Sequence, residues 1–426
     1  MEYFRVEGGR PLEGTVRVQG AKNSALPLLA ATLLARGETV LRNCPDLTDV
    51  TAALEILTCL GCRVSREGDA VRVDTSTLSG CVIPDGLMGR MRASVLCLGA
   101  LLARTGEVRA GWPGGCVLGA RPIDLHLGAF RTLGALVLDR EGCLSCESAG
   151  LQGRMLCLPF PSVGATENAM LCACGARGMT EIRNAAREPE IVDLQNFLRS
   201  MGADICGAGT ERIMIRGGKP LHATDYTVMP DRIAAATYLC AVASAGGEGE
   251  VTEACPEDLS PVLTALETAG CAVLKESDRM VVRADRPLQG IGRLITGPWP
   301  AFPTDAQPLL AAALAGGEGA TEIVETVFER RFRYVQGLRT MGADIRVAGD
   351  TAHLQGACLR GGAVTATDLR GGAALTIAAL GAEGESRIGG LAHIDRGYRS
   401  LEKDLSALGA SIRRVREPCG TRTSDM

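Results

Sequence analysis

One short motif recurs six times along the chain and constrains the fold more than any other feature. It consists of Leu, Met or Ala, then Gly, then Ala or Cys, and its copies lie 67 to 73 residues apart. The six glycines are Gly61, Gly134, Gly202, Gly270, Gly342 and Gly409. A regular period over most of a 426-residue chain indicates one supersecondary unit that is repeated and stacked.

The residues around each motif follow the same local pattern. An Ala/Leu/Cys-rich helix comes first and closes at a glycine, for which we expect the left-handed position after the helix. These closing glycines are Gly37, Gly106, Gly178, Gly249, Gly319 and Gly384. A strand such as 39–41 follows, then an amphipathic helix such as 191–198, the motif, and an alternating strand such as 71–74. The pattern predicts an α/β fold of six helix–strand–helix–strand units, each with room for one more strand.

Composition indicates how such units pack and what they bind. Hydrophobic residues make up 46% of the chain and aromatic residues only 3%, so small side chains must fill the interior. A chain of 426 residues exceeds the usual size of one core, and we expect at least two domains. The net charge of −4 is spread evenly without a basic block, so nucleic acid is not an expected partner.

Three features bear on the location of the protein. The first residues lack a basic region followed by an apolar core, and Gly, Arg or Glu interrupts each Ala/Leu stretch before it reaches membrane-spanning length. We therefore expect neither export nor a membrane anchor. The 17 cysteines are irregularly spaced, which favours reduced thiols and a cytoplasmic protein over a disulfide framework.

Two Cys-x-x-Cys pairs raise the question of zinc. Cys62, in the pair with Cys59, fills the third motif position, where four other repeats have Ala, so we expect it to pack in a core. Cys143 and Cys146 lie three apart on an expected strand and should face opposite ways. Because the chain also lacks a second ligand pair, clustered histidines and a glycine-rich nucleotide loop, we expect no metal and no cofactor.

Four features are not explained by the repeat, and the first is the segment 19–24. It carries Lys22, one of only four lysines beside 41 arginines, with Asn23 as the expected helix cap. A helix N-terminus with a nearby ammonium group suits a phosphate or a carboxylate. A helix cap without a ligand is the alternative.

The second and third features are loops that each present one reactive group. Segment 111–124 is glycine-rich and carries Cys116, with Arg121 five residues later. A thiol near positive charge can act as an acid or a nucleophile, although a turn with an incidental cysteine is the alternative. Segment 297–305 contains three prolines before Asp305. This carboxylate is either a general base or the N-cap of an expected helix at 306–314.

The fourth feature is a set of arginines in turns. Arginine binds carboxylate and phosphate through two parallel hydrogen bonds, so several of these side chains could converge on one anion. A solvated surface position is the alternative for each of them. The arginines are Arg92, Arg187, Arg232, Arg331, Arg370 and Arg396.

At these same segments the chain resembles the enolpyruvyl transferases, and among them those whose acceptor is UDP-N-acetylglucosamine. The resemblance extends over nearly the whole chain. Its segments are 20–23, 113–116, 119–126, 162–166, 185–190, 230–232, 302–305, 366–370 and 393–398. So many separate segments in the same order exclude a chance similarity.

The resemblance implies two inside-out α/β barrel (prism) domains, each built of three repeats with the helices inside and the sheets outside. One domain would comprise residues 22–229 and carry the Cys116 loop as a lid. The other would comprise residues 1–21 and 230–426 and carry Asp305. The active site would lie in the cleft between them.

The implied reaction transfers the enolpyruvyl group of phosphoenolpyruvate to the 3′-hydroxyl of UDP-N-acetylglucosamine, releases phosphate and begins peptidoglycan synthesis. Cys116 would be the proton donor and the target of the epoxide fosfomycin, and Asp305 would be the base. Lys22, Arg121 and Arg396 would hold phosphate, and Arg331 and Arg370 would lie near the carboxylate. Asn23, beside Lys22, would also bind substrate. The positions that match contacts to the nucleotide sugar are Arg92, Arg121, Pro122, Ile123, Asp124, Leu125, Ser162, Val163, Gly164, Asp305 and Val327.

Two other interpretations stay open. The same fold can transfer the enolpyruvyl group to shikimate 3-phosphate, although the Asp-Lys-Ser start typical of those enzymes is absent here. A catalytically silent paralogue could bind the nucleotide sugar and regulate the pathway, but it would not need Lys22, Cys116 and Asp305 together. Phosphate release with each acceptor distinguishes the three. The sequence predicts no oligomeric state.

Overall fold

The computed structural model describes residues 2–114, 118, 122–140 and 142–417. The chain divides into two compact units, each with its own hydrophobic core. Unit 1 comprises residues 1–18, 232–297 and 301–426, and unit 2 comprises residues 19–231 and 298–300. Across the described residues, no helix is both long enough and apolar enough to cross a membrane.

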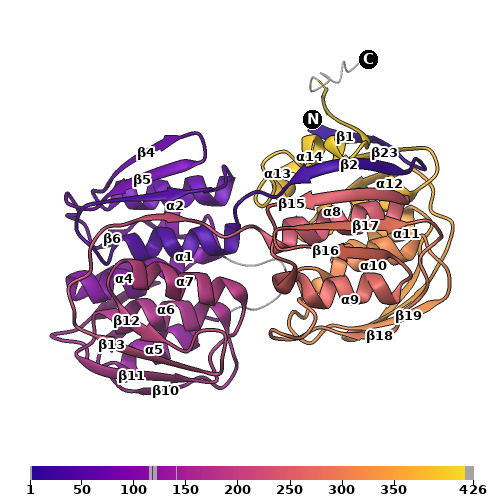
Figure 1. The fold of residues 1–426 in the computed structure, drawn as a ribbon. Helices are drawn as coiled ribbons and strands as arrows, with labels where there is room; N and C mark the ends of the chain where they lie inside the picture. Colours follow the sequence, from indigo (N-terminus) through magenta and orange to yellow (C-terminus); the bar gives the residue numbers. More distant parts are fainter. Residues whose placement is uncertain (1, 115–117, 119–121, 141, 418–426) are drawn as a thin grey trace, which may run out of the picture. The chain divides into compact units, whose positions relative to one another are not determined.

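Unit 2 contains three four-stranded sheets and a set of short helices (Figure 1). Its strands are β3 (Glu38–Arg42), β4 (Arg63–Glu67), β5 (Ala70–Asp74), β6 (Val82–Ile83), β7 (Glu107–Gly111), β8 (Leu136–Arg140), β9 (Cys143–Glu147), β10 (Met155–Cys157), β11 (Gly178–Arg183), β12 (Asp204–Cys206), β13 (Arg212–Gly217) and β14 (Asp225–Thr227). Its helices are α1 (Lys22–Thr32), α2 (Thr48–Cys59), α3 (Asp85–Met88), η1 (Arg92–Val95), α4 (Leu96–Thr105), α5 (Asp124–Thr132), α6 (Val163–Cys174) and α7 (Pro189–Ser200).

Unit 1 is built in the same way. Its strands are β1 (Glu2–Glu7), β2 (Leu12–Arg17), β15 (Gly247–Thr252), β16 (Ala272–Lys275), β17 (Arg279–Ala284), β18 (Gly292–Ile295), β19 (Ala320–Val324), β20 (Asp344–Ala348), β21 (Thr351–Gln355), β22 (Ala363–Thr365), β23 (Glu385–Gly389) and β24 (Ser411–Arg416). Its helices are α8 (Arg232–Ala245), η2 (Pro256–Leu259), α9 (Ser260–Thr268), α10 (Gln307–Ala315), η3 (Arg331–Tyr334), α11 (Val335–Thr340), α12 (Leu369–Gly381), α13 (Leu391–Ile394) and α14 (Leu401–Ala407).

Each sheet combines one parallel pair with antiparallel pairs. In the sheet β10-β11-β13-β12, β10 runs parallel to β11, and β13 pairs antiparallel with both β11 and β12. The parallel edge strand precedes the inner helix of its repeat, so the repeat is β-α-β-α-β-β. The expected strand order lacked this edge strand, which is only two to six residues long. So short a run carries almost no periodicity in sequence.

Strands distant in sequence complete three of the sheets. In unit 2, β14 from the end of the unit pairs in parallel with β3 near its beginning. In unit 1, β2 pairs in parallel with β15, and β1 inserts between β23 and β24. Each unit is therefore closed by its own chain ends.

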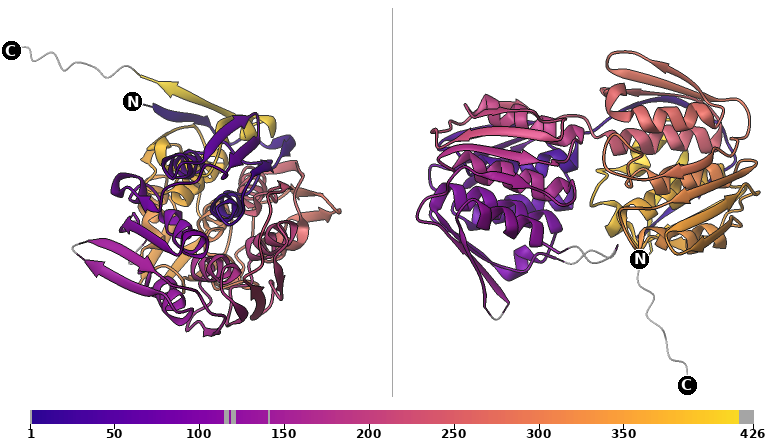
Figure 2. Two further views of the ribbon diagram at one scale, coloured as in Figure 1. Left: turned by 90° about the vertical axis from the view of Figure 1, so that its left-hand side faces the viewer. Right: turned by 90° about the horizontal axis from the view of Figure 1, so that it is seen from below.

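The inner helix of each repeat lies in the interior of its unit. In unit 2, α4 packs on both α1 and α6, and in unit 1, α8, α10 and α12 pack on one another. Nearly every residue of these six helices is buried. The left view of Figure 2 looks nearly along the helices of unit 2, with the strands outside them. The α/β class with inward helices and outward sheets is confirmed.

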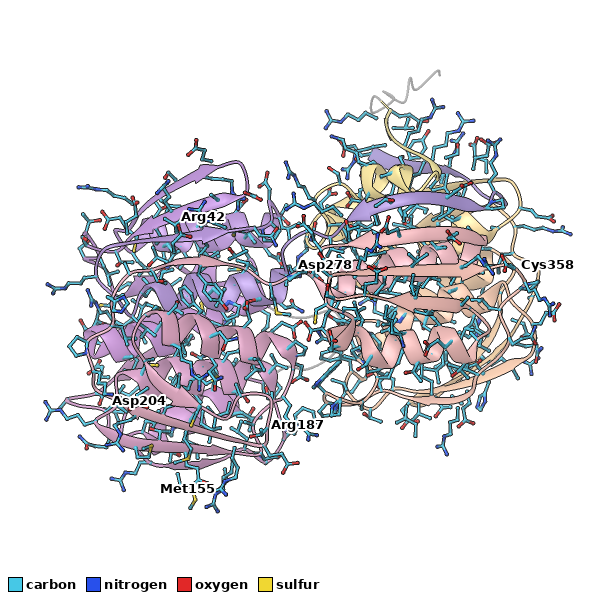
Figure 3. The ribbon with its side chains drawn as sticks, viewed as in Figure 1. Arg42, Met155, Arg187, Asp204, Asp278 and Cys358 are labelled. Atoms are coloured by element: carbon cyan, nitrogen blue, oxygen red, sulfur yellow. The ribbon has the colours of Figure 1, made fainter. Side chains whose placement is uncertain are left out.

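The outer faces of the sheets are solvated and mostly polar. Arg42 on β3 forms an exposed ion pair with Asp225 on β14, with 2.6 Å between Nη2 and Oδ2 (Figure 3). Met155 and Asp204, on the two edge strands of another sheet, are also exposed (Figure 3). Alternation along most strands thus places Val, Ile and Leu inward and polar or charged residues outward, with exposed apolar residues such as Met155 as exceptions.

The six motif glycines adopt one backbone conformation. Their φ angles range from +88° to +101°, the left-handed region that glycine enters without steric cost. Only Gly106 directly follows the last residue of its helix. Gly37, Gly178, Gly319 and Gly384 lie three to five residues beyond the helix ends, so their predicted closing positions were wrong. Five of the six closing glycines have positive φ, but Gly249 does not. It lies inside β15, and Gly246 and Gly247 make the left-handed turn in its place. The prediction for Gly249 was therefore wrong by two to three residues.

The cysteine pairs separate as their positions predicted. Cys62 and Cys146 are buried, and Cys59 and Cys143 are exposed. Each pair therefore places one thiol in a core and one at the surface. The described cysteines are free thiols.

Candidate functional site

Asp305 of unit 1 is bound by two arginines from separate elements. It lies in the turn before α10. The N-cap residue of α10 is Ala306, which makes no side-chain hydrogen bond, so the capping interpretation of Asp305 was wrong. Its Oδ1 is paired with Arg331 at the start of η3, and its Oδ2 lies 3.3 Å from Nη2 of Arg370 in the first turn of α12. Both guanidinium groups are almost fully buried, whereas the carboxylate is 30% exposed. This site therefore holds two cations beside one accessible carboxylate.

Glu325 connects the Asp305 turn to the loop that carries Val327. Both carboxylate oxygens of buried Glu325 lie 3.0 Å from Thr304 Oγ1, and Oε1 accepts hydrogen bonds from the backbone N–H groups of Val327 and Phe328. Arg331 strengthens the connection, because its Nε donates to the Thr304 carbonyl at 2.9 Å. These hydrogen bonds thus fix residues 304–305 and residues 327–328 relative to each other.

Arg370 has a second partner on its other side. Its Nη1 donates to the Tyr398 hydroxyl at 3.2 Å, and its guanidinium carbon lies 5.8 Å from the centre of the Tyr398 ring. Arg396 lies two residues before Tyr398, between α13 and α14, and is partly buried. The structure thereby brings Asp305, Arg331 and Arg370 together in unit 1.

Lys22 is the first residue of α1 and is buried. Its Nζ lies 3.2 Å from Asp49 Oδ2, and its backbone N–H donates to Asp231 Oδ2 at 3.2 Å. Asn23 does not cap the helix, because the N-cap residue is Ala21 and makes no side-chain hydrogen bond. The buried ammonium group is therefore held close to carboxylates at the start of an inner helix.

The predicted nucleotide-sugar residues of unit 2 lie around the starts of three helices. Arg92 begins η1, and its Nη2 donates to the Pro122 carbonyl at 2.9 Å. Ile123 precedes α5, which begins with Asp124 and Leu125. Ser162 caps α6 by accepting the Ala165 N–H at 3.4 Å, and Val163 and Gly164 form the first turn.

Gly164 faces the neighbouring helix at close range. A Cβ atom on Gly164 would lie 3.2 Å from the imidazole ring of His126 on α5. Ring nitrogen Nδ1 of His126 is in turn 3.0 Å from Asn168 Nδ2 on α6. These contacts bring segment 122–125 and segment 162–164 together in unit 2.

Other predicted residues lie apart from these groups or outside the described chain. Cys116 and Arg121 are outside the described residues. Arg187 forms an exposed ion pair with Glu211 at 3.7 Å, and Figure 3 shows its side chain at the surface. Arg232 is buried as the first residue of α8. The arginines therefore do not all share one environment.

A buried carboxyl group in unit 2 was not predicted. Glu167 lies on inner helix α6, and burial raises its pKa well above the usual range, with further contributions from Glu190 and Glu188. This carboxyl therefore keeps its proton to a higher pH than an ordinary glutamate. No sequence motif marked Glu167, Asp49 or Glu325, whereas Tyr398 belonged to the matched segment 393–398.

Comparison with known families identifies the group to which the chain belongs. The profile of the family described as EPSP synthase (3-phosphoshikimate 1-carboxyvinyltransferase) matches residues 6–405. The chain belongs to this family of enolpyruvyl transferases. As the sequence resemblance implied, it is a transferase.

Two relatives match over their full length. One is named UDP-N-acetylglucosamine 1-carboxyvinyltransferase 2 and comes from Caldanaerobacter subterraneus subsp. tengcongensis. It is 48% identical, and the match covers 97% of this chain and 100% of the relative. Another of the same name, from Carboxydothermus hydrogenoformans, is 46% identical over 97% of this chain and 100% of its own.

Solved structures of family members share the fold. The enolpyruvyl transferase NikO from Streptomyces tendae matches with a TM-score of 0.88 and 28% identity, over 98% of this chain and 99% of NikO. EPSP synthase from Acinetobacter baumannii matches with a TM-score of 0.78 and 20% identity, over 98% of this chain and 100% of that chain. The second likeness concerns the fold alone.

Proposed function

We propose that this chain transfers the enolpyruvyl group of phosphoenolpyruvate to the 3′-hydroxyl of UDP-N-acetylglucosamine and releases phosphate. The observation that carries the proposal is the convergence of two buried guanidinium groups, Arg331 and Arg370, on the accessible carboxylate of Asp305. Such a group offers both a base and positive charge for an anionic substrate. The full-length relatives named for this reaction support the same acceptor.

In the addition step, the sugar 3′-oxygen forms a bond to C2 of phosphoenolpyruvate. Asp305 accepts the hydroxyl proton, and Cys116 protonates the C3 methylene to a methyl group. Lys22, Arg121 and Arg396 balance the charge on phosphate, and Arg331 and Arg370 hold the carboxylate. In the elimination step, a proton of the C3 methyl group returns to the Cys116 thiolate, and the electron pair of that C–H bond forms the C2–C3 double bond as the bond from C2 to the phosphate oxygen breaks. Phosphate leaves with the proton that Asp305 took from the sugar hydroxyl.

The remaining predicted contacts belong to the nucleotide sugar. In this proposal Asn23, Arg92, residues 121–125, residues 162–164, Asp305 and Val327 bind the acceptor. The catalytic domains comprise residues 22–229 and the remainder of the chain. The product enters peptidoglycan synthesis, and the free thiols favour a reducing compartment such as the cytoplasm.

The test measures phosphate release from phosphoenolpyruvate by the full chain, with UDP-N-acetylglucosamine, with shikimate 3-phosphate, and with neither acceptor. Release that depends on the nucleotide sugar and stops after fosfomycin treatment is the expected result. Release with shikimate 3-phosphate but not with UDP-N-acetylglucosamine would show that shikimate 3-phosphate is the acceptor. No release, combined with binding of the nucleotide sugar, would favour the regulatory paralogue.

A further inference from the structure

We propose that Tyr398 and Thr237 are positioning residues that fix the orientation of the Arg370 guanidinium group for the carboxylate of phosphoenolpyruvate. The inference rests on the proposed function, because it concerns the substrate group that Arg370 would bind. It follows from one chain of hydrogen bonds in unit 1. Arg370 Nη1 lies 3.2 Å from the Tyr398 hydroxyl, and that hydroxyl lies 2.7 Å from Thr237 Oγ1.

The carbonyl oxygen of Ile233, at the end of this chain of hydrogen bonds, determines which atom donates in each bond. Thr237 Oγ1 lies 2.8 Å from the carbonyl oxygen of Ile233, which can only accept, so the threonine proton points there. The hydroxyl of Thr237 must then accept the proton of Tyr398. The Tyr398 oxygen is left with lone pairs toward Arg370, whose N–H groups can only donate.

This polarity suits a cation. Because the tyrosine proton points to Thr237, the hydroxyl presents negative charge to the guanidinium group and cannot rotate without breaking a buried bond. The Tyr398 ring also lies against the guanidinium group, 5.8 Å from its carbon to the ring centre. Nη2 of Arg370 then reaches Asp305 at 3.3 Å from the other side.

The three residues come from two helices and a loop, and all are buried. Arg370 is in the first turn of α12, Tyr398 follows α13, and Thr237 lies within α8. Water therefore cannot easily replace a lost partner, and an arginine side chain with many rotamers is held in one of them. A planar guanidinium group binds a carboxylate through two parallel bonds only when its plane is correctly oriented.

The neighbouring Tyr238 provides a matched control. It is as deeply buried as Tyr398 in the same unit, and its hydroxyl donates to Asp404 Oδ2 at 2.7 Å. Tyr238→Phe therefore removes a tyrosine hydroxyl and its partly buried hydrogen bond to Asp404, and it leaves the Tyr398 hydroxyl beside Arg370 in place. A role of Tyr398 in stability alone would give the same result for both variants.

The experiment compares Tyr398→Phe, Thr237→Val, Thr237→Ser, the Tyr398→Phe/Thr237→Val double variant and Tyr238→Phe in the full chain. The KM for each substrate is measured by phosphate release, and the Kd for phosphoenolpyruvate is measured by calorimetry. Tyr398→Phe should raise the KM and Kd for phosphoenolpyruvate roughly tenfold, as expected for loss of a hydrogen bond to a charged group, with the KM for the nucleotide sugar unchanged.

The remaining variants test whether the bonds act in series. Thr237→Val should weaken phosphoenolpyruvate binding less than Tyr398→Phe, and Thr237→Ser, which keeps the hydroxyl, should restore it. The double variant should be no worse than Tyr398→Phe alone, because both changes break one chain. Tyr238→Phe should leave both constants unchanged.

The outcomes separate this inference from the proposed function. Unchanged phosphoenolpyruvate constants in Tyr398→Phe, or an equal rise in Tyr238→Phe, would overturn the positioning role. A wild-type protein that binds phosphoenolpyruvate without turnover would overturn the proposed function, and the Kd values would still decide the role of Tyr398. A wild-type protein that does not bind phosphoenolpyruvate would overturn both.

Discussion

Arg370 and Asp305 lie 65 residues apart in sequence and meet with 3.3 Å between Nη2 and Oδ2. The buried guanidinium group needs a negative partner, because an uncompensated charge away from water is costly. Asp305 supplies that negative charge, and its other carboxylate oxygen is paired with Arg331. The carboxylate proposed to take the sugar proton is therefore held by the side chains proposed to bind the second substrate.

Replacing the charge of Asp305 tests its role as a base. Asp305→Asn keeps the shape of the side chain but cannot accept the hydroxyl proton, so kcat should fall by about 10²- to 10⁴-fold. Binding of phosphoenolpyruvate should persist, because Arg331 and Arg370 keep their positive charge. Stopped-flow phosphate release and calorimetry measure the two effects. Asp344→Asn, on exposed β20, is the control, and normal turnover by Asp305→Asn would exclude the base.

Removing the thiol of Cys116 tests the proton donor. Cys116→Ala should lose turnover by at least about 10²-fold, the usual contribution of a positioned acid, while it still binds UDP-N-acetylglucosamine. The control is Cys143→Ala, which removes an exposed thiol from β9 and should be fully active. Undiminished phosphate release by Cys116→Ala would contradict the role of this residue.

The buried carboxyl group of Glu167 should make stability depend on pH. Its pKa in the folded state is raised, chiefly by burial, so its stabilising contribution is complete below the unfolded-state pKa of about 4.3. This contribution is lost as the pH rises through the folded-state pKa. Glu167→Gln has no proton to lose, so its unfolding free energy should exceed that of the wild type by a margin that grows as the pH rises above the unfolded-state pKa of about 4.3.

Urea unfolding at several pH values measures this margin. Glu181→Gln should show the opposite sign, because hydrogen bonds from Arg183 and Arg212 lower the pKa of Glu181. Its stabilising contribution is present above the unfolded-state pKa and is lost as the pH falls. A margin for Glu167→Gln that does not change with pH would show that Glu167 is ionised in the folded protein.

Two motif glycines with nearly equal φ separate backbone strain from steric overlap. Gly134 has φ +96°, and an added Cβ would meet nothing within 4 Å. Gly134→Ala should therefore cost only the strain of the left-handed conformation, about 1–2 kcal/mol of unfolding free energy. Gly61 has φ +92°, but an added Cβ would lie 2.7 Å from Ser79 Oγ and 3.0 Å from the Thr77 carbonyl oxygen.

Gly61→Ala should therefore be more destabilising than Gly134→Ala. Urea unfolding of both variants gives the comparison. Equal losses would mean that the segment around Ser79 moves away at no cost, so that strain alone accounts for both changes.

The repeat and the fold class follow from local patterns along the chain. Left-handed glycines and short amphipathic helices depend on neighbouring residues, so the motif at Gly134 and the helix around 191–198 were readable without tertiary contacts. The family could likewise be recognised from sequence, because its segments occur in the same order along the chain. Gly249 was misplaced because Gly246, Gly247 and Gly249 lie within four positions, and only the strand register distinguishes them.

The closure of the repeats and the pairing of charged residues depend on tertiary contacts. The pairing of β14 with β3 joins segments more than 180 residues apart, and nothing local in either strand specifies its partner. The same holds for Lys22 beside Asp49 and for the chain from Arg370 through Tyr398 to Thr237. A buried charge or hydroxyl group needs a partner, and here the partner comes from a segment distant in sequence that only tertiary packing brings near.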